Sequence, residues 1–68
     1  MLVFTEHAER RRKERGMTEI DIELVVKQPF LQKRRQDGLI EVICKARNRN
    51  IKVVYEKRET HLRIITVI

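Results

Sequence analysis

TEIDIELVVKQPFLQKRRQDGLIEV, residues 18–42, contains the point at which the chain changes from helical to strand periodicity. Before Pro29, the apolar residues follow a helical spacing and form one wide face that should be buried: Ile20, Ile22, Leu24, Val25 and Val26. A cap at Thr18 opens this helix, and Pro29 ends it, because the residue before a proline avoids the helical region. After Pro29 the period becomes two, and Asp37-Gly38 is typical of a two-residue hairpin turn.

The segment before it, FTEHAERRRKERGMT at residues 4–18, predicts a short first helix that ends at Arg15, with Gly16 as its left-handed stop. Its few apolar residues indicate a peripheral helix, held partly by the stems of its arginines. Residues four apart lie on the same side of a helix, so His7, Arg11 and Arg15 share one face. This face places one titratable imidazole beside two permanent cations, a grouping that suits an anion such as phosphate better than a hydrophobic core.

Four strands are predicted after the second helix: Phe30–Gln36, Leu39–Arg47, Ile51–Lys57 and His61–Ile68. Turn residues separate them, including Asn48-Arg49-Asn50, where asparagine tolerates positive φ. Two helices followed by an antiparallel meander predict a single α+β domain over residues 1–68, with both helices on one face of a four-stranded antiparallel sheet. The other face would carry much of the lysine and arginine. A further edge strand at Leu2-Val3-Phe4 stays open as an alternative.

The chain is strongly basic. It has 68 residues, with 16 Lys and Arg against 10 Asp and Glu, a formal net charge of +6 and a pI near 10.1. A basic surface favours nucleic acid, an acidic protein or anionic lipid as a partner. The single cysteine makes no internal disulfide, which fits a reducing cytoplasm, and no apolar run is long enough to span a membrane.

The N-terminal half also resembles a known family. The pattern is Phe4-x-x-His7-Ala8-x-x-Arg11-x-x-x-Arg15-Gly16-Met17-Thr18, then Ile22-x-x-Val25 and Pro29, then a basic hairpin and further strands. It resembles the small prokaryotic DUF4258 family, which is similar to RelE/ParE-like and BrnT-like toxins within the barnase/RelE-like ribonuclease fold group. The resemblance implies a RelE-like two-layer fold, toxin-type RNA cleavage without a metal, and an antitoxin partner. It carries over to His7, Arg11, Arg15 and Gly16.

Metal-free RNA cleavage needs a base for the 2′-hydroxyl proton, cations for the phosphate and an acid for the leaving oxygen. His7 would act as the general base or acid, because the ordinary histidine pKa of ~6.5 is close to working pH. Arg11 and Arg15 would hold the phosphate. In the structural alternative, His7 packs at the start of the helix and the arginines are a solvated cover over the sheet. Both interpretations stay open.

Tyr55 and His61 are candidates for a second proton-transfer or base-stacking group. Tyr55 is in phase with Ile51 and Val53, which also indicates a place at the rim of the core, and His61 opens a strand near a turn. Cys44 is in phase with apolar neighbours and predicts a packed, unreactive thiol. Two histidines and one cysteine match no metal-ligand spacing, so neither a metal nor another cofactor is expected.

Basic residues of the strands and turns form the candidate nucleic-acid-binding set: Lys33, Arg35, Lys45, Arg47, Arg49 and Lys52. They would follow a phosphate backbone or, in the alternative, protect edge strands from pairing. Three hypotheses follow: a toxin-like ribonuclease acting on RNA, a non-catalytic nucleic-acid-binding module, and a protein-interaction domain. In the third, the apolar end at residues 64–68 offers a strand for pairing with an antitoxin or with a second copy in a homodimer.

Overall fold

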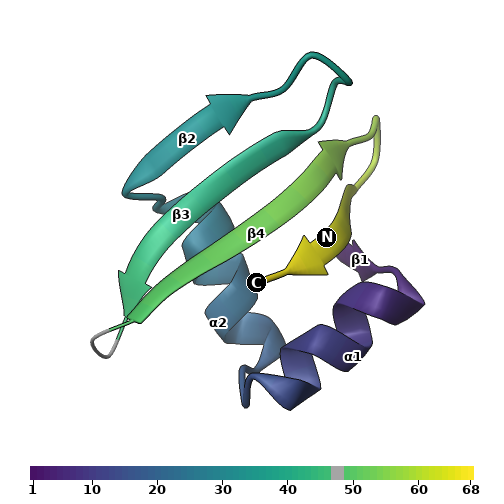
Figure 1. Ribbon diagram of the computed structural model, residues 1–68. Coiled ribbons are helices and arrows are strands. Elements are labelled where there is room, and N and C mark those ends of the chain that lie inside the picture. The colour runs from purple at the N-terminus through teal and green to yellow at the C-terminus, as the bar shows by residue number, and fades with distance from the viewer. Residues whose placement is uncertain (47–48) are drawn as a thin grey trace.

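The computed structural model describes residues 1–46 and 49–68, which form two helices and one five-stranded sheet (Figure 1). The elements in chain order are β1 (Leu2–Phe4), α1 (Glu6–Glu14), α2 (Glu19–Lys27), β2 (Leu31–Arg34), β3 (Ile40–Ala46), β4 (Arg49–Lys57) and β5 (Leu62–Val67). Both helices follow β1 in the chain and lie on the same face of the sheet (Figure 1). The predicted α+β class is therefore confirmed.

The sheet differs from the predicted four antiparallel strands. Its order is β1-β5-β4-β3-β2, and β1 pairs with β5 in parallel while the other pairs are antiparallel. The edge strand at Leu2–Phe4, which the sequence left open as an alternative, is therefore present. Hairpin signals report only strands that are close in sequence, whereas β1 pairs with residues 62–64 across the whole chain.

Local capping signals define both ends of the loop between the helices. The Thr18 hydroxyl accepts the Asp21 N–H at 3.1 Å and the Asp21 carboxylate accepts the Thr18 N–H at 2.9 Å, so the capping box is complete. Helix α1 ends at Glu14, one residue before the predicted end at Arg15, which is its C-cap. Gly16 follows the C-cap with φ +68°. The N–H groups of Gly16 and Met17 donate to Lys13 and Arg12, as in a Schellman motif.

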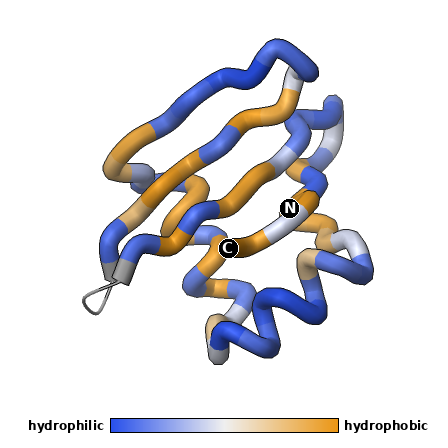
Figure 2. Tube along the Cα trace, in the orientation of Figure 1, coloured by the Kyte–Doolittle hydropathy of each residue, from blue (hydrophilic) through white to orange (hydrophobic). Residues whose placement is uncertain are grey.

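The core lies between the helices and the inner face of the sheet. Its fully buried side chains include Ala8, Ile22, Val42, Val53, Ile64 and Val67. Cys44 is partly buried and packs against this cluster, so the predicted packing is confirmed, and its lack of reactivity stays a prediction. Along the chain, hydrophobic residues alternate in the strands while α1 is hydrophilic over most of its length (Figure 2). Burial of one face of α1, α2, β3, β4 and β5 therefore holds the fold together. β2 is exposed over its whole length, and Ile20 and Leu24 of the predicted apolar face of α2 are exposed as well, so that face is narrower than predicted.

The β2–β3 hairpin has a three-residue loop, so the predicted two-residue turn is wrong. Arg35 N–H donates to the Leu39 carbonyl at 2.8 Å, and Gly38 N–H donates to the Arg35 carbonyl at 3.2 Å. Gly38 has φ +86°, the left-handed residue that follows a type I turn in such loops. An Asp-Gly pair suits both loop lengths, and the strand pairing selects the longer one. The first predicted strand is shortened accordingly.

A β-bulge interrupts β5. Val54 pairs with Thr66 and Tyr55 pairs with Ile64, which leaves Ile65 as an extra residue. The bulge changes the phase of the strand, so Val67 faces the core together with Ile64, although simple alternation puts them on opposite faces. The predicted turn at 48–50 is also wrong for its last two residues, which begin β4, and residues 47 and 48 lie outside the described part of the chain.

Candidate nucleic-acid interface

Helix α1 covers the part of the β5 edge that β1 does not reach. The Thr5 N–H donates to the Ile64 carbonyl at 3.1 Å, and the Thr5 hydroxyl donates to the Ile65 carbonyl at 3.0 Å. Six residues further along the chain, Arg11 Nε donates to the Val67 carbonyl at 3.4 Å. Side chains of the helix therefore continue the hydrogen bonding that β1 begins, and the face predicted from the four-residue spacing lies along this edge.

His7 lies on the same edge and is exposed to solvent. Its Nε2 is 2.9 Å from the Thr66 hydroxyl, and its Nδ1 is 3.5 Å from Arg10 Nη2. A guanidinium can only donate, so this arrangement fits the tautomer in which Nδ1 accepts from Arg10 and Nε2 donates to Thr66. Thr66 pairs with Val54 on the sheet face that carries no helix, which we call the open face. His7 thus stands at the border of the open face.

Arg15 is the third member of the predicted helix face. Together with Met17 it lines a small crevice at the end of the sheet with Asn50, Ile51 and Ile68. Ile68 exchanges two backbone hydrogen bonds with Lys52, so Arg15 lies near the same end of the sheet as Lys52. The structure brings His7, Arg11 and Arg15 along one border of the sheet, and their catalytic roles remain a prediction.

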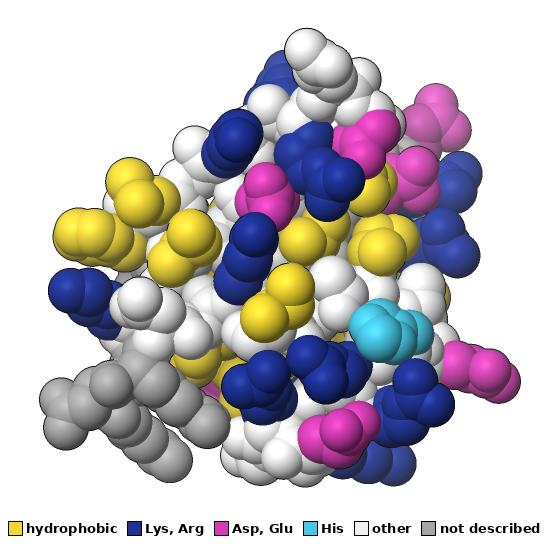
Figure 3. Space-filling model, viewed as in Figure 1, with side chains coloured by type: hydrophobic (Ala, Val, Ile, Leu, Met, Phe, Trp, Pro, Cys, Tyr) yellow, Lys and Arg dark blue, Asp and Glu magenta, His cyan; other side chains and the backbone are white. Residues whose placement is uncertain are grey.

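The open face carries lysines from three strands. Lys33 on β2 pairs in register with Glu41 on β3. The Glu41 carboxylate forms an ion pair with Lys52 on β4, with Nζ and Oε1 2.7 Å apart. The hydrogen bond from Lys52 holds the pKa of Glu41 below its ordinary value of 4.5, so this carboxylate stays ionised. Lys45 is exposed on the same face. Figure 3 shows lysine and arginine side chains over the strands and over the adjoining side of α1.

These cations and the His7 imidazole form one surface, which we call the basic face. Its members are the α1 residues at the border and the lysines of the open face: His7, Arg11, Arg15, Lys33, Lys45 and Lys52. The two sets join because α1 is bonded to β5 by Thr5 and Arg11. Three remaining candidates are placed differently. Arg35 pairs with Asp37 at 2.9 Å within the hairpin loop, Arg47 lies outside the described residues, and the Arg49 side chain is not described.

The two other candidate catalytic residues do not reach His7. Tyr55 is 7% exposed and belongs to the core on the helix side of the sheet. His61 precedes β5 and lies beside Thr60, with its Nδ1 3.2 Å from the Thr60 hydroxyl. Thr66 is near the other end of β5, five residues later and roughly 16 Å away at about 3.3 Å per residue. The second proton-transfer group expected from the sequence is therefore not assembled beside the first.

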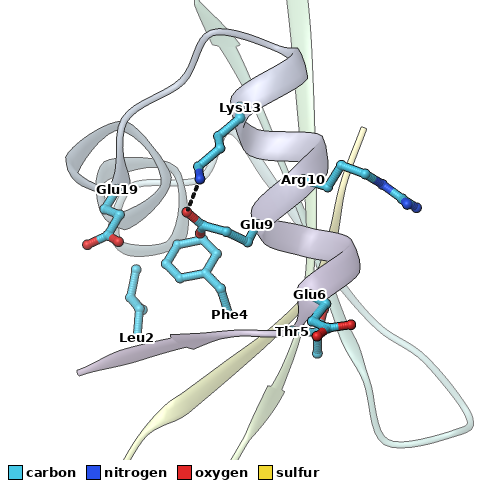
Figure 4. Close-up of a pocket in the computed structure, with 8 residues that line it drawn as sticks. All are labelled: Leu2, Phe4, Thr5, Glu6, Glu9, Arg10, Lys13 and Glu19. Atoms are coloured by element: carbon cyan, nitrogen blue, oxygen red, sulfur yellow. Dashed lines mark ion pairs between the residues drawn. The ribbon is translucent and has the colours of Figure 1, made fainter.

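The far side of α1 has a different character. A hollow of about 640 Å³ lies between α1, β1 and α2, with several carboxylates on its lining: Glu6, Glu9 and Glu19 (Figure 4). Glu9 and Lys13 point toward it, whereas Arg10 extends to the opposite side of the helix. Arg12 and Lys13 pair with Glu9 on this side, so acidic and basic charges largely balance here, and the basic face remains the candidate interface.

Arg12 is a structural residue that the sequence prediction missed. Its side chain is only 13% exposed, and its guanidinium donates to the Met17 carbonyl at 2.7 Å and forms a two-point ion pair with Glu9. Hydrogen bonding from Arg12 lowers the pKa of Glu9. Its Cζ also lies 5.9 Å from the centre of the Phe4 ring. The three-residue spacing of Glu9 and Arg12 could have predicted their ion pair. It could not have predicted the bond from Arg12 to the Met17 carbonyl in the loop between the helices.

The predicted pairing strand at residues 64–68 does not have a free edge for most of its length. It lies between β4 and the β1–α1 border, while β1 and β2 are the two outer strands of the sheet. An antitoxin or a second copy as a partner stays a prediction. Within residues 1–46 and 49–68 no His, Cys, Asp or Glu side chains cluster in threes around a possible metal position. The same residues contain no helix long and apolar enough to cross a membrane.

Comparison with known proteins identifies the family but not an activity. A family model described as a domain of unknown function (DUF4258) matches residues 4–68. Neither the search of curated proteins nor the search of solved structures gave a match. The match spans both helices and nearly the whole sheet, including the predicted His7, Arg11 and Arg15 positions. The chain therefore belongs to the DUF4258 family.

Proposed function

We propose that this protein binds RNA through the basic face. The observation that carries the proposal is the bonding of α1 to the β5 edge, which places helix cations beside the lysines of the open face. A phosphate backbone crossing this surface meets cations from the helix and then from several strands. The formal net charge of +6 adds long-range attraction for a polyanion. On the opposite side of α1 the cations lie beside carboxylates and show no comparable excess of positive charge.

Salt dependence is the physical signature of such binding. Each lysine or arginine that neutralises a phosphate releases counterions, so affinity falls as salt rises. For a single strand the logarithmic slope is about −0.7 per phosphate contacted. Binding of a fluorescent RNA oligomer is measured by anisotropy at several salt concentrations. The slope of log affinity against log salt then gives the number of phosphates contacted.

Lys52 and Lys27 provide a matched pair of variants. Lys52 pairs with Glu41 at 2.7 Å on the open face, and Lys27 pairs with Glu23 at 2.8 Å on α2, on the helix side. Both changes to glutamine remove one cation from a lysine–glutamate pair. Lys52→Gln should weaken RNA binding and reduce the slope by about 0.7, whereas Lys27→Gln should leave the slope unchanged. Equal effects of the two variants would contradict binding through the basic face.

A second candidate function is metal-independent RNA cleavage of the RelE/BrnT toxin type. The observation that favours it is that His7 contacts Arg10 and that His7 and Arg11 bond to neighbouring residues of β5, Thr66 and Val67, at the border of the proposed RNA surface. Arginines beside a bound phosphate stabilise the charge that develops in the transition state. Tyr55 is buried and His61 is distant, so His7 is the one titratable side chain that we assign to proton transfer among the described residues.

Variants of the two histidines distinguish RNA cleavage from RNA binding alone. Purified protein is incubated with RNA in the presence of EDTA, together with the variants His7→Ala and His61→Ala. Cleavage by the wild type and by His61→Ala, with loss of cleavage in His7→Ala, is the expected result. Cleavage that persists in His7→Ala removes His7 from the chemistry. Binding without any product leaves the first proposal as the function of the basic face.

A further inference from the structure

The corner of the open face where β2 begins carries an exposed aromatic ring. Phe30 is 68% exposed, although its backbone N–H is fixed to the Ile43 carbonyl at 2.8 Å. The Lys45 ammonium lies 6.0 Å from the centre of the Phe30 ring. Leu31, the next residue, is 58% exposed and pairs in register with Ile43. An anchored backbone with a solvent-facing ring beside a lysine is an arrangement suited to a flat, anionic ligand.

A hollow of about 330 Å³ adjoins this corner. Leu31 and Ile43 supply its apolar surface, and its polar lining comes from Gln32, Lys33, Glu41 and Lys52. The charge of Glu41, the acid among these residues, is offset by Lys52 at 2.7 Å. Hydrophobic side chains lie between lysines and arginines on this part of the open face (Figure 3). The corner and the hollow together place apolar surface next to cations on the basic face.

We propose that Phe30 and the Leu31–Ile43 hollow form a nucleobase-binding site that selects single-stranded RNA. This inference rests on RNA binding by the basic face and adds the strandedness of the ligand. One base stacks on the Phe30 ring, and a neighbouring base covers the hollow, while Lys45, Lys33 and Lys52 contact the phosphates. Stacking on an aromatic side chain requires a base whose flat face is free, and in a duplex those faces are already stacked on their neighbours.

The test compares three ligands matched in their number of phosphates: an unstructured RNA oligomer, an RNA duplex of half its length and inorganic polyphosphate, which has no bases. The wild type should bind the single strand more tightly than either of the others. Phe30→Ala should weaken single-strand binding about tenfold (~1.4 kcal/mol) without changing the salt slope or the affinity for polyphosphate. Phe30→Tyr should restore most of the affinity. Ile20→Ala removes another exposed apolar side chain, 70% exposed on α2, and should change nothing.

The outcomes distinguish this inference from the proposal it rests on. Equal affinity of Phe30→Ala and the wild type for the single strand overturns the nucleobase site and leaves RNA binding intact. Tighter binding of the wild type to the duplex than to the single strand, or equal affinity for polyphosphate and the single strand, also overturns the nucleobase site. Failure of the wild type to bind all three ligands overturns the proposed function itself. Phe30 lies outside the core, so circular dichroism of Phe30→Ala should match that of the wild type.

Discussion

The His7 Nε2 atom and the Thr66 hydroxyl lie 2.9 Å apart, although 59 positions separate the two residues in the chain. This contact ties the first turn of α1 to the last part of β5, one residue past the bulge. It also orients the imidazole at the border of the open face. A hydrogen bond of this kind contributes about 1 kcal/mol in typical proteins, which is enough to select one ring orientation.

The first prediction concerns this contact. If His7 performs proton transfer, Thr66→Val should reduce RNA cleavage by up to about tenfold, because the ring loses its preferred orientation. RNA affinity should not change, since valine removes no charge. Thr66→Ser keeps the hydroxyl and should retain cleavage. Rates measured in EDTA together with binding curves check the prediction, and a Thr66→Ser enzyme as slow as Thr66→Val would contradict the role given to the hydroxyl.

Arg12 should matter to stability far more than its neighbour Lys13. Arg12→Ala removes the bonds to the Met17 carbonyl and to Glu9, whereas Lys13 is 70% exposed with a 3.9 Å contact to Glu9. Buried or half-buried partners left without a donor destabilise a fold, and exposed ion pairs contribute little. Thermal unfolding should show Tm lower by several degrees for Arg12→Ala and nearly unchanged for Lys13→Ala. Equal Tm values for the two variants would contradict a stabilising role for the Arg12 bonds to Met17 and Glu9.

Gly16→Ala should destabilise the protein by about 1 kcal/mol. The residue has φ +68°, which an L-residue with a Cβ adopts only at a cost of about 1–2 kcal/mol. No atom lies within 4 Å of a Cβ placed there, so the cost comes from the backbone alone. Gly16→Asn should lose less, because asparagine tolerates the left-handed region better than alanine. Urea unfolding of the two variants measures the difference, and an asparagine variant less stable than the alanine variant would contradict the backbone explanation.

The Glu41–Lys52 pair should add a pH dependence at acid pH. Lys52 lowers the folded-state pKa of Glu41 below 4.5, so the stabilisation is present above pH 4.5 and is lost as pH falls through that lower pKa. Lys52→Gln should raise the pKa of Glu41 toward its ordinary value. Carboxyl titration followed by NMR checks this, with Glu23, which pairs with Lys27, as an unaffected comparison. An unchanged Glu41 pKa in Lys52→Gln would refute the assigned cause.

Much of the helical part follows from local sequence signals. The Thr18 cap, the Gly16 stop and the Pro29 break act through neighbours within a few residues, so their effects are readable without the fold. Strand periodicity is equally local, which is why three of the predicted strands recur with small changes at their ends. The four-residue spacing also places His7 and Arg11 on one side of α1, the side that contacts β5.

The sequence by itself determined the α+β class, the capped helices and the basic character, because these depend on short-range periodicity and on composition. Only the tertiary structure decided the parallel pairing of β1 with β5, the bulge at Ile65, and the neighbours of His7 and Phe30. Those features join residues far apart in the chain. Their geometry depends on how the elements pack to bury one shared core, and a local pattern carries no record of that packing.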